Sequence, residues 1–380
     1  MKITARALSN EIYEIEVDGP VFKKITPHKG DILDLPWIAP GLIDIQINGF
    51  AGIDFNRPLE SDEAWRHVTQ QLYAHGCTGF LIALITNRDE GYRSLLDDLT
   101  KRLRRDPRNG LGFHMEGPWL NPDPGCRGAH RPEWMRKPDV HVLEEWSELA
   151  GDLLKLVTLA PEIDPEASFE VIRAGVKKKI QFFIGHSAAM GEILRQAVEA
   201  GAAGWTHLGN AMPATVPKFE NVMLHALAQP RFLASLIPDG LHVPPHAFRA
   251  LARALDLEAS SRLLLTTDAM AGAGVSKPGT YTLGEVEVEV GVDSSARLPG
   301  SGRLAGSTLT PFVGVFRAEQ MAGIYLEDAW TAFSTNPAAL LGFNHSITVG
   351  HSADFVLLSP EKTPYLLATY HRGECVYEAP

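Results

Sequence analysis

Short hydrophobic runs recur through the middle of the chain, and each is followed by a longer stretch with mixed polarity. A short apolar run bounded by turn residues predicts a buried strand, and apolar positions spaced by three and four residues predict a helix. Eight such units in succession are typical of a closed parallel (β/α)8 barrel of the TIM type. The predicted strands are Leu42–Ile47, Phe80–Ile85, Leu111–Met115, Leu154–Leu159, Phe182–Ile184, Gly204–Thr206, Leu233–Ile237 and Leu263–Thr266.

Helices are predicted between these strands and after the last one. Ser61 can cap the first of them, and Gly76 can stop it. The predicted helices include Ser61–His75, Asp164–Lys179, Pro245–Leu255, Thr310–Met321 and Asp328–Leu341. Between the eighth strand and the last two helices, alternating residues and Gly/Pro turns predict a β-hairpin insertion over about residues 281–304.

The two ends of the chain show a different pattern. Residues 1–38 contain short alternating segments such as Glu11–Val17, and residues 347–380 return to short apolar runs such as Phe355–Leu358. Alternation with a period of two predicts half-buried strands. We therefore expect residues 1–38 and 347–380 to form one small β domain beside a hydrolase barrel of residues 39–346.

Composition narrows the classes of function. The 380 residues carry a formal charge of −11, which argues against a nucleic-acid or anionic membrane surface. The three cysteines have no paired spacing and are typical of reduced thiols. No apolar run has the length of a signal peptide core or a membrane span. These features predict a cytoplasmic protein that binds neither nucleic acid nor membrane.

Candidate chemistry stands where the predicted strands end. His186 follows the fifth strand and His207 ends the sixth, while Glu116 ends the third and Asp268 the eighth. The C-terminal ends of barrel strands meet on one edge, where barrel enzymes place their active sites. Two imidazoles and one carboxylate form a divalent-metal site with an open position for water. Asp268 is then placed to act as a general base beside that water.

Two further histidines stay open at this point. His114 precedes Glu116 by two residues, so it is either a ligand or a buried supporting residue. His130 follows the third strand in a loop that leaves the active edge, and it either contacts substrate or is solvated. The metal is also open, since such a site accepts Zn²⁺, Fe²⁺, Co²⁺ or Mn²⁺; we expect Zn²⁺.

Motifs spread through most of the chain resemble those of the amidohydrolase superfamily, and within it the N-acetylglucosamine-6-phosphate deacetylases. They include His114–Trp119, Gly185–Ala188, Thr206–Leu208 and Thr267–Ala269. The resemblance implies hydrolysis of the N-acetyl group of N-acetylglucosamine-6-phosphate to glucosamine-6-phosphate and acetate. It implies Glu116, His186 and His207 as metal ligands, Asp268 as the acid/base, and a homodimer. The substrate-contacting residues it implies are Ala129, His130, Asn210, Ala211, His242, Leu304, Ala305, Gly306 and Ser307.

Two departures refine this expectation. Most amidohydrolases carry His-x-His at the end of the first strand, where this chain has Gln46 and Asn48, so we expect one metal ion per subunit. Lys218 stands where the deacetylases that this sequence resembles have an arginine, and that arginine reaches the phosphate of the neighbouring subunit's substrate. Lysine lacks the bidentate fork of arginine, and Glu220 is nearby. A different or unphosphorylated N-acetylamino sugar is therefore an alternative substrate.

Two other readings of the barrel are open. A cyclic amidohydrolase of the dihydroorotase or hydantoinase kind typically binds two metals through His-x-His and a lysine, and strand four here ends in Ala160-Pro161-Glu162. A barrel without activity, kept for binding, tends to lose its metal ligands, whereas all four core groups are present here. Turnover of a cyclic amide would identify the cyclic amidohydrolase. A barrel without activity should purify with little stoichiometric metal, which metal analysis would show.

Overall fold

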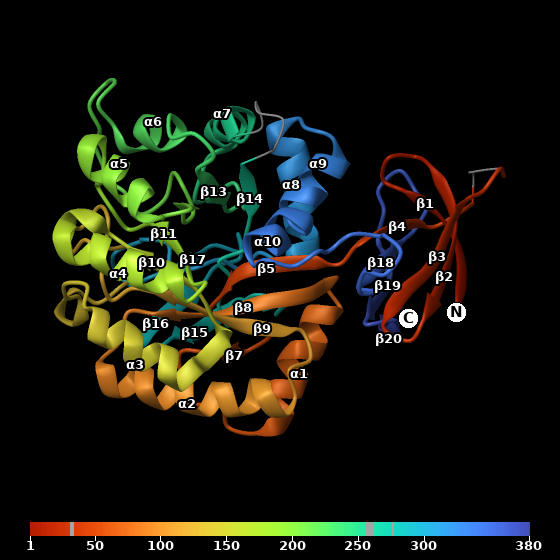
Figure 1. Ribbon diagram of the computed structural model, residues 1–380, viewed down its shortest axis with the longest axis horizontal. Coiled ribbons are helices and arrows are strands. Elements are labelled where there is room, and N and C mark those ends of the chain that lie inside the picture. The colour runs from red at the N-terminus through yellow and green to blue at the C-terminus, as the bar shows by residue number, and fades with distance from the viewer. Residues whose placement is uncertain (31–33, 256–261, 276) are drawn as a thin grey trace.

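The computed structural model describes residues 1–30, 34–255, 262–275 and 277–380. Its larger sheet has eight strands in the order β14-β13-β12-β11-β10-β9-β8-β5, and neighbouring strands pair in parallel (Figure 1). This is the predicted (β/α)8 barrel. The strands are β5 (Leu42–Ile47), β8 (Cys77–Ile85), β9 (Gly110–Glu116), β10 (Leu154–Leu159), β11 (Gln181–Ile184), β12 (Gly204–Trp205), β13 (Leu233–Leu236) and β14 (Leu263–Leu265).

The seam between β5 and β14 is closed by polar contacts. A parallel bridge joins Ile47 to Ala269 just beyond β14. The buried Asp44 carboxylate on β5 accepts hydrogen bonds from the Thr266 hydroxyl at 2.5 Å and the Thr267 backbone N–H at 3.0 Å. Burial raises the pKa of Asp44 to about 6, and these hydrogen bonds oppose that rise. Asp44 therefore links the first and last strands of the barrel.

Helices cover the outside of the barrel sheet (Figure 1). Their ends follow the capping residues: Ser61 accepts a hydrogen bond from the Ala64 N–H, Asp164 accepts one from Ala167, and Gly201 ends a helix in the left-handed conformation. The helices are α1 (Asp62–Tyr73), α2 (Asp89–Arg105), α3 (Val140–Ala150), α4 (Pro165–Lys177), α5 (Gly191–Ala200), α6 (Val222–Leu227), α7 (Pro245–Leu255), α8 (Pro311–Ala322), α9 (Leu326–Ala332) and α10 (Thr335–Leu340).

The single helix expected over Asp328–Leu341 is wrong, because the structure has two helices there. α9 ends before Phe333, and α10 begins at Thr335 with Pro337 in its first turn. Proline has no N–H, and its ring conflicts with the carbonyl four residues earlier, here that of Phe333. One continuous helix through Pro337 is thus disfavoured, whereas proline is tolerated in a first turn.

Both ends of the chain meet in a second sheet, set apart from the barrel (Figure 1). Its order is β20-β19-β18-β4-β1-β2-β3, and β4 pairs antiparallel with β18, which joins the two termini. Its own core contains Ile15, Phe22 and Phe355. The strands are β1 (Lys2–Ala7), β2 (Ile12–Asp18), β3 (Val21–Pro27), β4 (Trp37–Pro40), β18 (Phe355–Leu358), β19 (Leu366–His371) and β20 (Glu374–Glu378). The exact division at residues 38/39 and 346/347 stays a prediction.

The insertion after β14 packs beside the C-terminal mouth of the barrel. It is a three-stranded sheet of β15 (Gly279–Leu283), β16 (Val286–Val290) and β17 (Ala296–Arg297), so the expected hairpin gains one short strand. Leu283 and Val288 pack with Ile85 and Met270 of the barrel. The Asp54 carboxylate, on the short hairpin of β6 (Gly49–Phe50) and β7 (Ile53–Asp54), accepts a hydrogen bond from the Gly284 N–H at 2.8 Å. That contact ties the tip of the insertion to the barrel.

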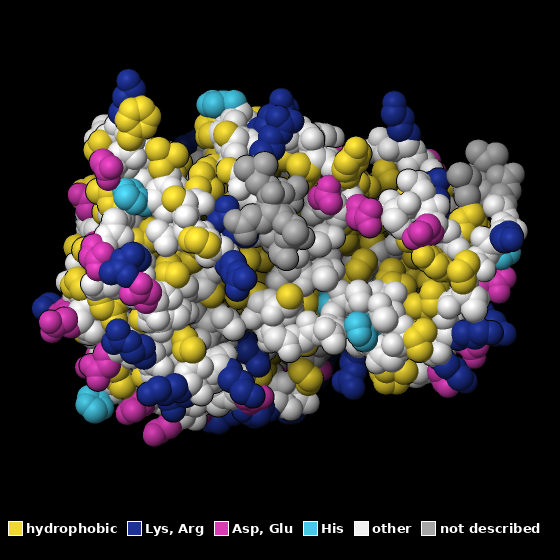
Figure 2. All heavy atoms as spheres, turned by 45° about the horizontal axis from the view of Figure 1, so that its top comes forward, with side chains coloured by type: hydrophobic (Ala, Val, Ile, Leu, Met, Phe, Trp, Pro, Cys, Tyr) yellow, Lys and Arg dark blue, Asp and Glu magenta, His cyan; other side chains and the backbone are white. Residues whose placement is uncertain are grey.

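The described helices include none that is both long enough and apolar enough to cross a bilayer. On the face drawn in Figure 2, basic and acidic side chains of the described residues are interspersed, rather than gathered by sign. Such a face lacks the broad basic surface that nucleic-acid binding requires.

Candidate active site

Left-handed backbone turns aim the functional side chains into the mouth of the barrel. His186 follows β11, His207 follows β12 and Asp268 follows β14, with φ values of 51°, 35° and 51°. Positive φ is uncommon for residues other than glycine and costs on the order of 1–3 kcal/mol at such a position. Three such residues at one barrel edge indicate that the surrounding fold holds this arrangement for function.

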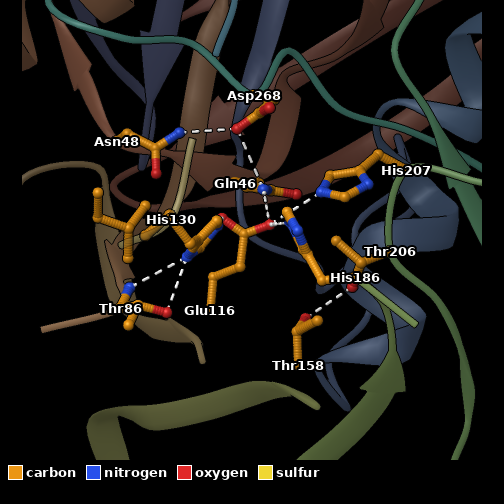
Figure 3. A network of polar contacts seen from close by, with 12 residues as sticks. Gln46, Asn48, Thr86, Glu116, His130, Thr158, His186, Thr206, His207 and Asp268 are labelled. Atoms are coloured by element: carbon orange, nitrogen blue, oxygen red, sulfur yellow. Dashed lines mark hydrogen bonds and ion pairs between the residues drawn. The ribbon is translucent and has the colours of Figure 1, made fainter. Parts of the chain in front are cut away.

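The Glu116 carboxylate is the centre of the site (Figure 3). Its Oε1 lies 2.8 Å from His207 Nε2 and 3.1 Å from His186 Nε2, and its Oε2 lies 3.6 Å from His130 Nε2. All four side chains are buried. Burial opposes the charge of Glu116, but the three imidazoles beside it outweigh burial and hold its pKa well below the ordinary value.

The tautomer of His186 leaves a lone pair facing Glu116. Its Nδ1 lies 2.8 Å from the Cys126 carbonyl oxygen, and a carbonyl can only accept, so Nδ1 carries the hydrogen. Burial lowers the pKa of His186, which favours the neutral ring with an unprotonated Nε2. Two lone pairs would then face each other across 3.1 Å. A cation between them removes this repulsion, so the donor set fits a divalent metal.

His130 has the opposite tautomer. Its Nδ1 accepts a hydrogen bond from the Thr86 backbone N–H at 3.3 Å and lies 2.8 Å from the Thr86 hydroxyl. A neutral ring with a lone pair at Nδ1 carries its hydrogen on Nε2, the atom that faces the pocket. Ligand atoms of Glu116, His130 and His186 all lie within 4.8 Å of one another. Because a protonated nitrogen cannot bind a metal, this tautomer favours His130 as a hydrogen-bond donor, and the assignment of His207 as third ligand stays a prediction.

Asp268 is held by two amides from the end of β5. Its Oδ1 accepts hydrogen bonds from Asn48 Nδ2 at 2.7 Å and from Gln46 Nε2 at 3.1 Å, and the same Gln46 nitrogen donates to Glu116 Oε1 at 2.8 Å. Burial and the nearby charge of Glu116 raise the pKa of Asp268 well above its ordinary value. A carboxyl with a raised pKa is suited to exchange a proton near neutral pH.

His114, left open by the sequence, is a buried supporting residue. Its Nδ1 donates to the Ile45 carbonyl at 3.0 Å, and its Nε2 lies 2.7 Å from the Thr158 hydroxyl, which in turn lies 2.6 Å from that of Thr206. Burial lowers its pKa to about 4, so the ring is neutral. With both nitrogens occupied, His114 has none left for a metal.

The predicted substrate residues divide into two groups. Asn210, His242, Leu304, Ala305, Gly306, Ala129 and His130 line a pocket together with the four core groups, and the pocket with its opening to solvent spans about 420 Å³. His242 is oriented by Asp239, whose carboxylate lies 2.6 Å from its Nδ1. Burial opposes the charge of Asp239, but the hydrogen bond from His242 outweighs it and lowers the pKa of this carboxyl.

Ala211, Lys218 and Ser307 do not line this pocket. Ser307 instead supports the backbone around Asp268. Its N–H donates to the Asp268 carbonyl oxygen at 2.8 Å, and its hydroxyl donates to the backbone carbonyl oxygen of Thr267 at 2.5 Å. Lys218 lies in the loop before α6, next to Phe219, which is 70% exposed. Its Nζ lies 5.6 Å from the centre of the Phe219 ring.

Sequence reasoning missed Thr86 and the bridging role of Gln46. Thr86 directly follows the last residue of β8, and Gln46 lies near the end of β5, so both occupy the active edge. The position at a strand end was the available signal. Neither residue is titratable, which is why a search for acids, bases and metal ligands passed over Thr86.

Comparisons with known proteins agree with this geometry. Residues 37–375 match the model of the amidohydrolase family. The chain is 35% identical to the N-acetylglucosamine-6-phosphate deacetylase of Rattus norvegicus, over 90% of this chain and 84% of the relative. It is 34% identical to the N-acetylglucosamine-6-phosphate deacetylase of Bacillus subtilis, over 85% of this chain and 81% of the relative.

Solved structures extend the likeness to the whole chain. The N-acetyl-D-glucosamine-6-phosphate deacetylase of Mycobacterium smegmatis superposes with a TM-score of 0.88 at 28% identity, covering 99% of this chain and 100% of the other. A mutant of that deacetylase, in complex with N-acetyl-D-glucosamine-6-phosphate, gives a TM-score of 0.86 at 27% identity, with 99% of each chain covered.

Proposed function

This chain belongs to the amidohydrolase family, and from that premise we propose that it hydrolyses the N-acetyl group of N-acetylglucosamine-6-phosphate, giving glucosamine-6-phosphate and acetate. One observation carries the proposal. The Glu116 carboxylate lies within 3.1 Å of two imidazole nitrogens, and the Gln46 amide joins it to the carboxyl of Asp268. A ligand set and an acid/base are thereby held side by side, as amide hydrolysis requires.

Glu116, His186 and His207 would hold one divalent metal ion per subunit, for which Zn²⁺ suits the two nitrogens and one carboxylate oxygen. When bound, such an ion lowers the pKa of a water ligand and polarises a carbonyl oxygen. Gln46 and Asn48 occupy the positions that would otherwise supply ligands for a second ion. Both amides instead donate hydrogen bonds to Asp268, so the chain favours a single-ion site.

Asp268 acts as general base and then as general acid. With Oδ1 accepting two amide hydrogens, Oδ2 is the oxygen left to take a proton from the attacking water. The same carboxyl then returns the proton to the leaving amine nitrogen as the C–N bond breaks. His130 donates from Nε2 to the acetyl carbonyl oxygen and stabilises the negative charge that develops there. His242, Asn210 and Gly306 bind the sugar.

The 6-phosphate and the oligomer form one connected part of the proposal. Lys218 is exposed on a projecting loop with Val216 and Phe219, so it is available to a second subunit. We propose a cytoplasmic homodimer in which Lys218 supplies the positive charge for the phosphate of the neighbour's substrate. A lysine acts there as a point charge, without a bidentate contact.

Acetate release by the purified, zinc-loaded protein tests the function, with N-acetylglucosamine-6-phosphate and N-acetylglucosamine assayed side by side. We expect a strong preference for the phosphorylated substrate. We also expect Lys218→Ala to raise KM for that substrate only, with Lys177→Ala, on the exposed end of α4, as the matched control. Equal turnover of both sugars would refute the phosphate assignment, and absence of acetate with either would refute the deacetylase. Turnover of a cyclic amide in its place would identify the alternative activity.

A further inference from the structure

A second cavity adjoins the catalytic pocket and shares two wall residues with it. It encloses about 850 Å³, part of it open to solvent, and its lining includes Asn56, the end of β8, and the turn Gly284–Val286 between β15 and β16. Ile85 and Ala129 line both spaces. Among the residues that the structure describes, only these two are common to the two linings, so they form the partition between them.

Ile85 is held firmly in that partition. Its side chain is 7% exposed and packs with Met270, Leu283 and Ala305. Its backbone N–H donates to Asn56 Oδ1 at 2.8 Å. Gly284 lies next to it, and a Cβ built there would be in ordinary van der Waals contact with Ile85 Cδ1, at 3.6 Å. The partition is therefore packed from both the barrel and the insertion.

Arg131 and Glu285 stand over the second cavity. They come from the loop after β9 and from the tip of the insertion, and their charged groups lie 3.3 Å apart. The lining of this cavity includes the apolar side chains of Leu95, Trp134 and Val286 as well as the polar ones of Asn56, Asn87 and Ser94. The apolar part of the cavity is suited to a short hydrocarbon chain that enters from the catalytic pocket.

The proposed chemistry directs the acyl chain of the substrate toward this partition. His130 Nε2 holds the carbonyl oxygen, and Asp268 must reach the amine nitrogen, so the third substituent of the carbonyl carbon points away from Asp268. Ala129 and Ile85 line the pocket together with His130. Thr86, which orients the His130 ring, itself lines the second cavity. The cavity therefore adjoins the part of the pocket around His130, where the acyl group is proposed to bind.

We propose that Ile85 limits the N-acyl group to acetyl, and that the cavity behind it is a latent site for longer unbranched acyl chains. The inference rests on the proposed deacetylase function and adds the residue that sets its acyl specificity. With a longer substrate the amide C–N bond breaks as before. Water supplies the hydroxyl that becomes part of the fatty acid and the proton that goes to the amine, so propionate or butyrate is released.

The test compares kcat/KM for the N-acetyl, N-propionyl and N-butyryl forms of glucosamine-6-phosphate, with the zinc-loaded full chain. Wild-type protein is expected to prefer acetyl over butyryl by at least a hundredfold. Ile85→Ala removes most of the partition side chain and is expected to raise the butyryl/acetyl ratio at least tenfold. Ile85→Val is a smaller truncation, and it is expected to raise kcat/KM for the N-propionyl substrate but not for the N-butyryl substrate. Thermal unfolding and metal content check that each variant is folded and loaded.

Two controls separate the cavity from a general loosening of the site. Val286→Ala enlarges the second cavity without changing the partition, and it should leave the butyryl/acetyl ratio of kcat/KM unchanged. The double variant Ile85→Ala with Val286→Phe refills the cavity and should lose the gain for butyryl. An unchanged butyryl/acetyl ratio in Ile85→Ala, an unchanged propionyl/acetyl ratio in Ile85→Val, or a gain for butyryl that survives the refilling, would overturn the inference while acetyl hydrolysis continues. Failure of wild-type protein to hydrolyse any of the three amides would instead overturn the proposed function.

Discussion

Asp268→Asn tests the assignment of the acid/base most directly, because the structure specifies which atom changes. Asp268 Oδ1 accepts from Asn48 at 2.7 Å and from Gln46 at 3.1 Å, and only an oxygen can take that place. An asparagine would therefore keep its carbonyl oxygen there and put its NH2 group where Oδ2 had been. The proton acceptor facing the pocket is lost, while the hydrogen bonds that position the side chain remain.

The size of the effect follows from the role. General acid–base catalysis contributes roughly 10²–10⁴-fold, which is about 2.7–5.4 kcal/mol in activation free energy at about 1.36 kcal/mol for each factor of ten. We expect kcat to fall by this factor. Stability should not fall, since the raised pKa of Asp268, caused by burial and the charge of Glu116, shows that its ionised form is disfavoured in the fold.

The assay is acetate release at saturating N-acetylglucosamine-6-phosphate, with metal content and thermal unfolding measured on the same preparations. Asp139→Asn, a change of the same chemistry at the exposed N-cap of α3, is the matched control and should retain full turnover. Turnover within tenfold of wild type at equal metal content would refute the role of Asp268. Loss of the metal in Asp268→Asn would show that this carboxylate is a ligand instead.

Three further predictions concern the surroundings of this residue. Thr86→Val removes the hydroxyl that lies 2.8 Å from His130 Nδ1. Because an orienting partner is lost, kcat should fall roughly 10–100-fold while KM changes little. Thr86→Ser keeps a hydroxyl and should retain most of the activity, and equal loss in both variants would argue against the orienting role. Glu116→Gln should abolish zinc binding, measured as metal per chain, and a fully loaded variant would contradict the ligand assignment. Burial raises the pKa of Asp54 to about 6, so the folded protein binds a proton there more tightly than the unfolded chain does. The contribution of this proton to the free energy of unfolding is fully present below about pH 4 and is lost as pH rises through 6. The advantage of wild type over Asp54→Asn in thermal unfolding should be larger at pH 5 than at pH 7, by about 1.3 kcal/mol, and an advantage that grows with pH would contradict the reasoning.

Much of the fold is readable from the chain because burial leaves a pattern in sequence. β5 and β8 are buried at all of their positions, and the second half of β8 appears in the sequence as an apolar run. Local rules also predicted helix starts at Ser61 and Asp164, where a side chain caps a backbone N–H. The break between α9 and α10 was accessible too, since Pro337 is visible in the sequence.

The identity of the candidate site was likewise contained in the sequence. Parallel strands carry their C-terminal ends to one edge, so strand order alone brings Glu116, His186, His207 and Asp268 together. The atomic roles within that group were not accessible in the same way. They depend on which ring nitrogen carries a hydrogen, and that is set by partners such as the Cys126 carbonyl and the Thr86 N–H.

The second cavity was beyond the reach of the sequence for a related reason. Its partition residue Ile85 resembles any other apolar residue at the end of a strand, and its other walls come from Asn56, Arg131 and Gly284–Val286. Local patterns report what each residue does to its own backbone and to the face it buries. A cavity, a tautomer and a partition are properties of side chains brought together from distant segments. Packing of the whole molecule decides them, because only there do these groups acquire their neighbours.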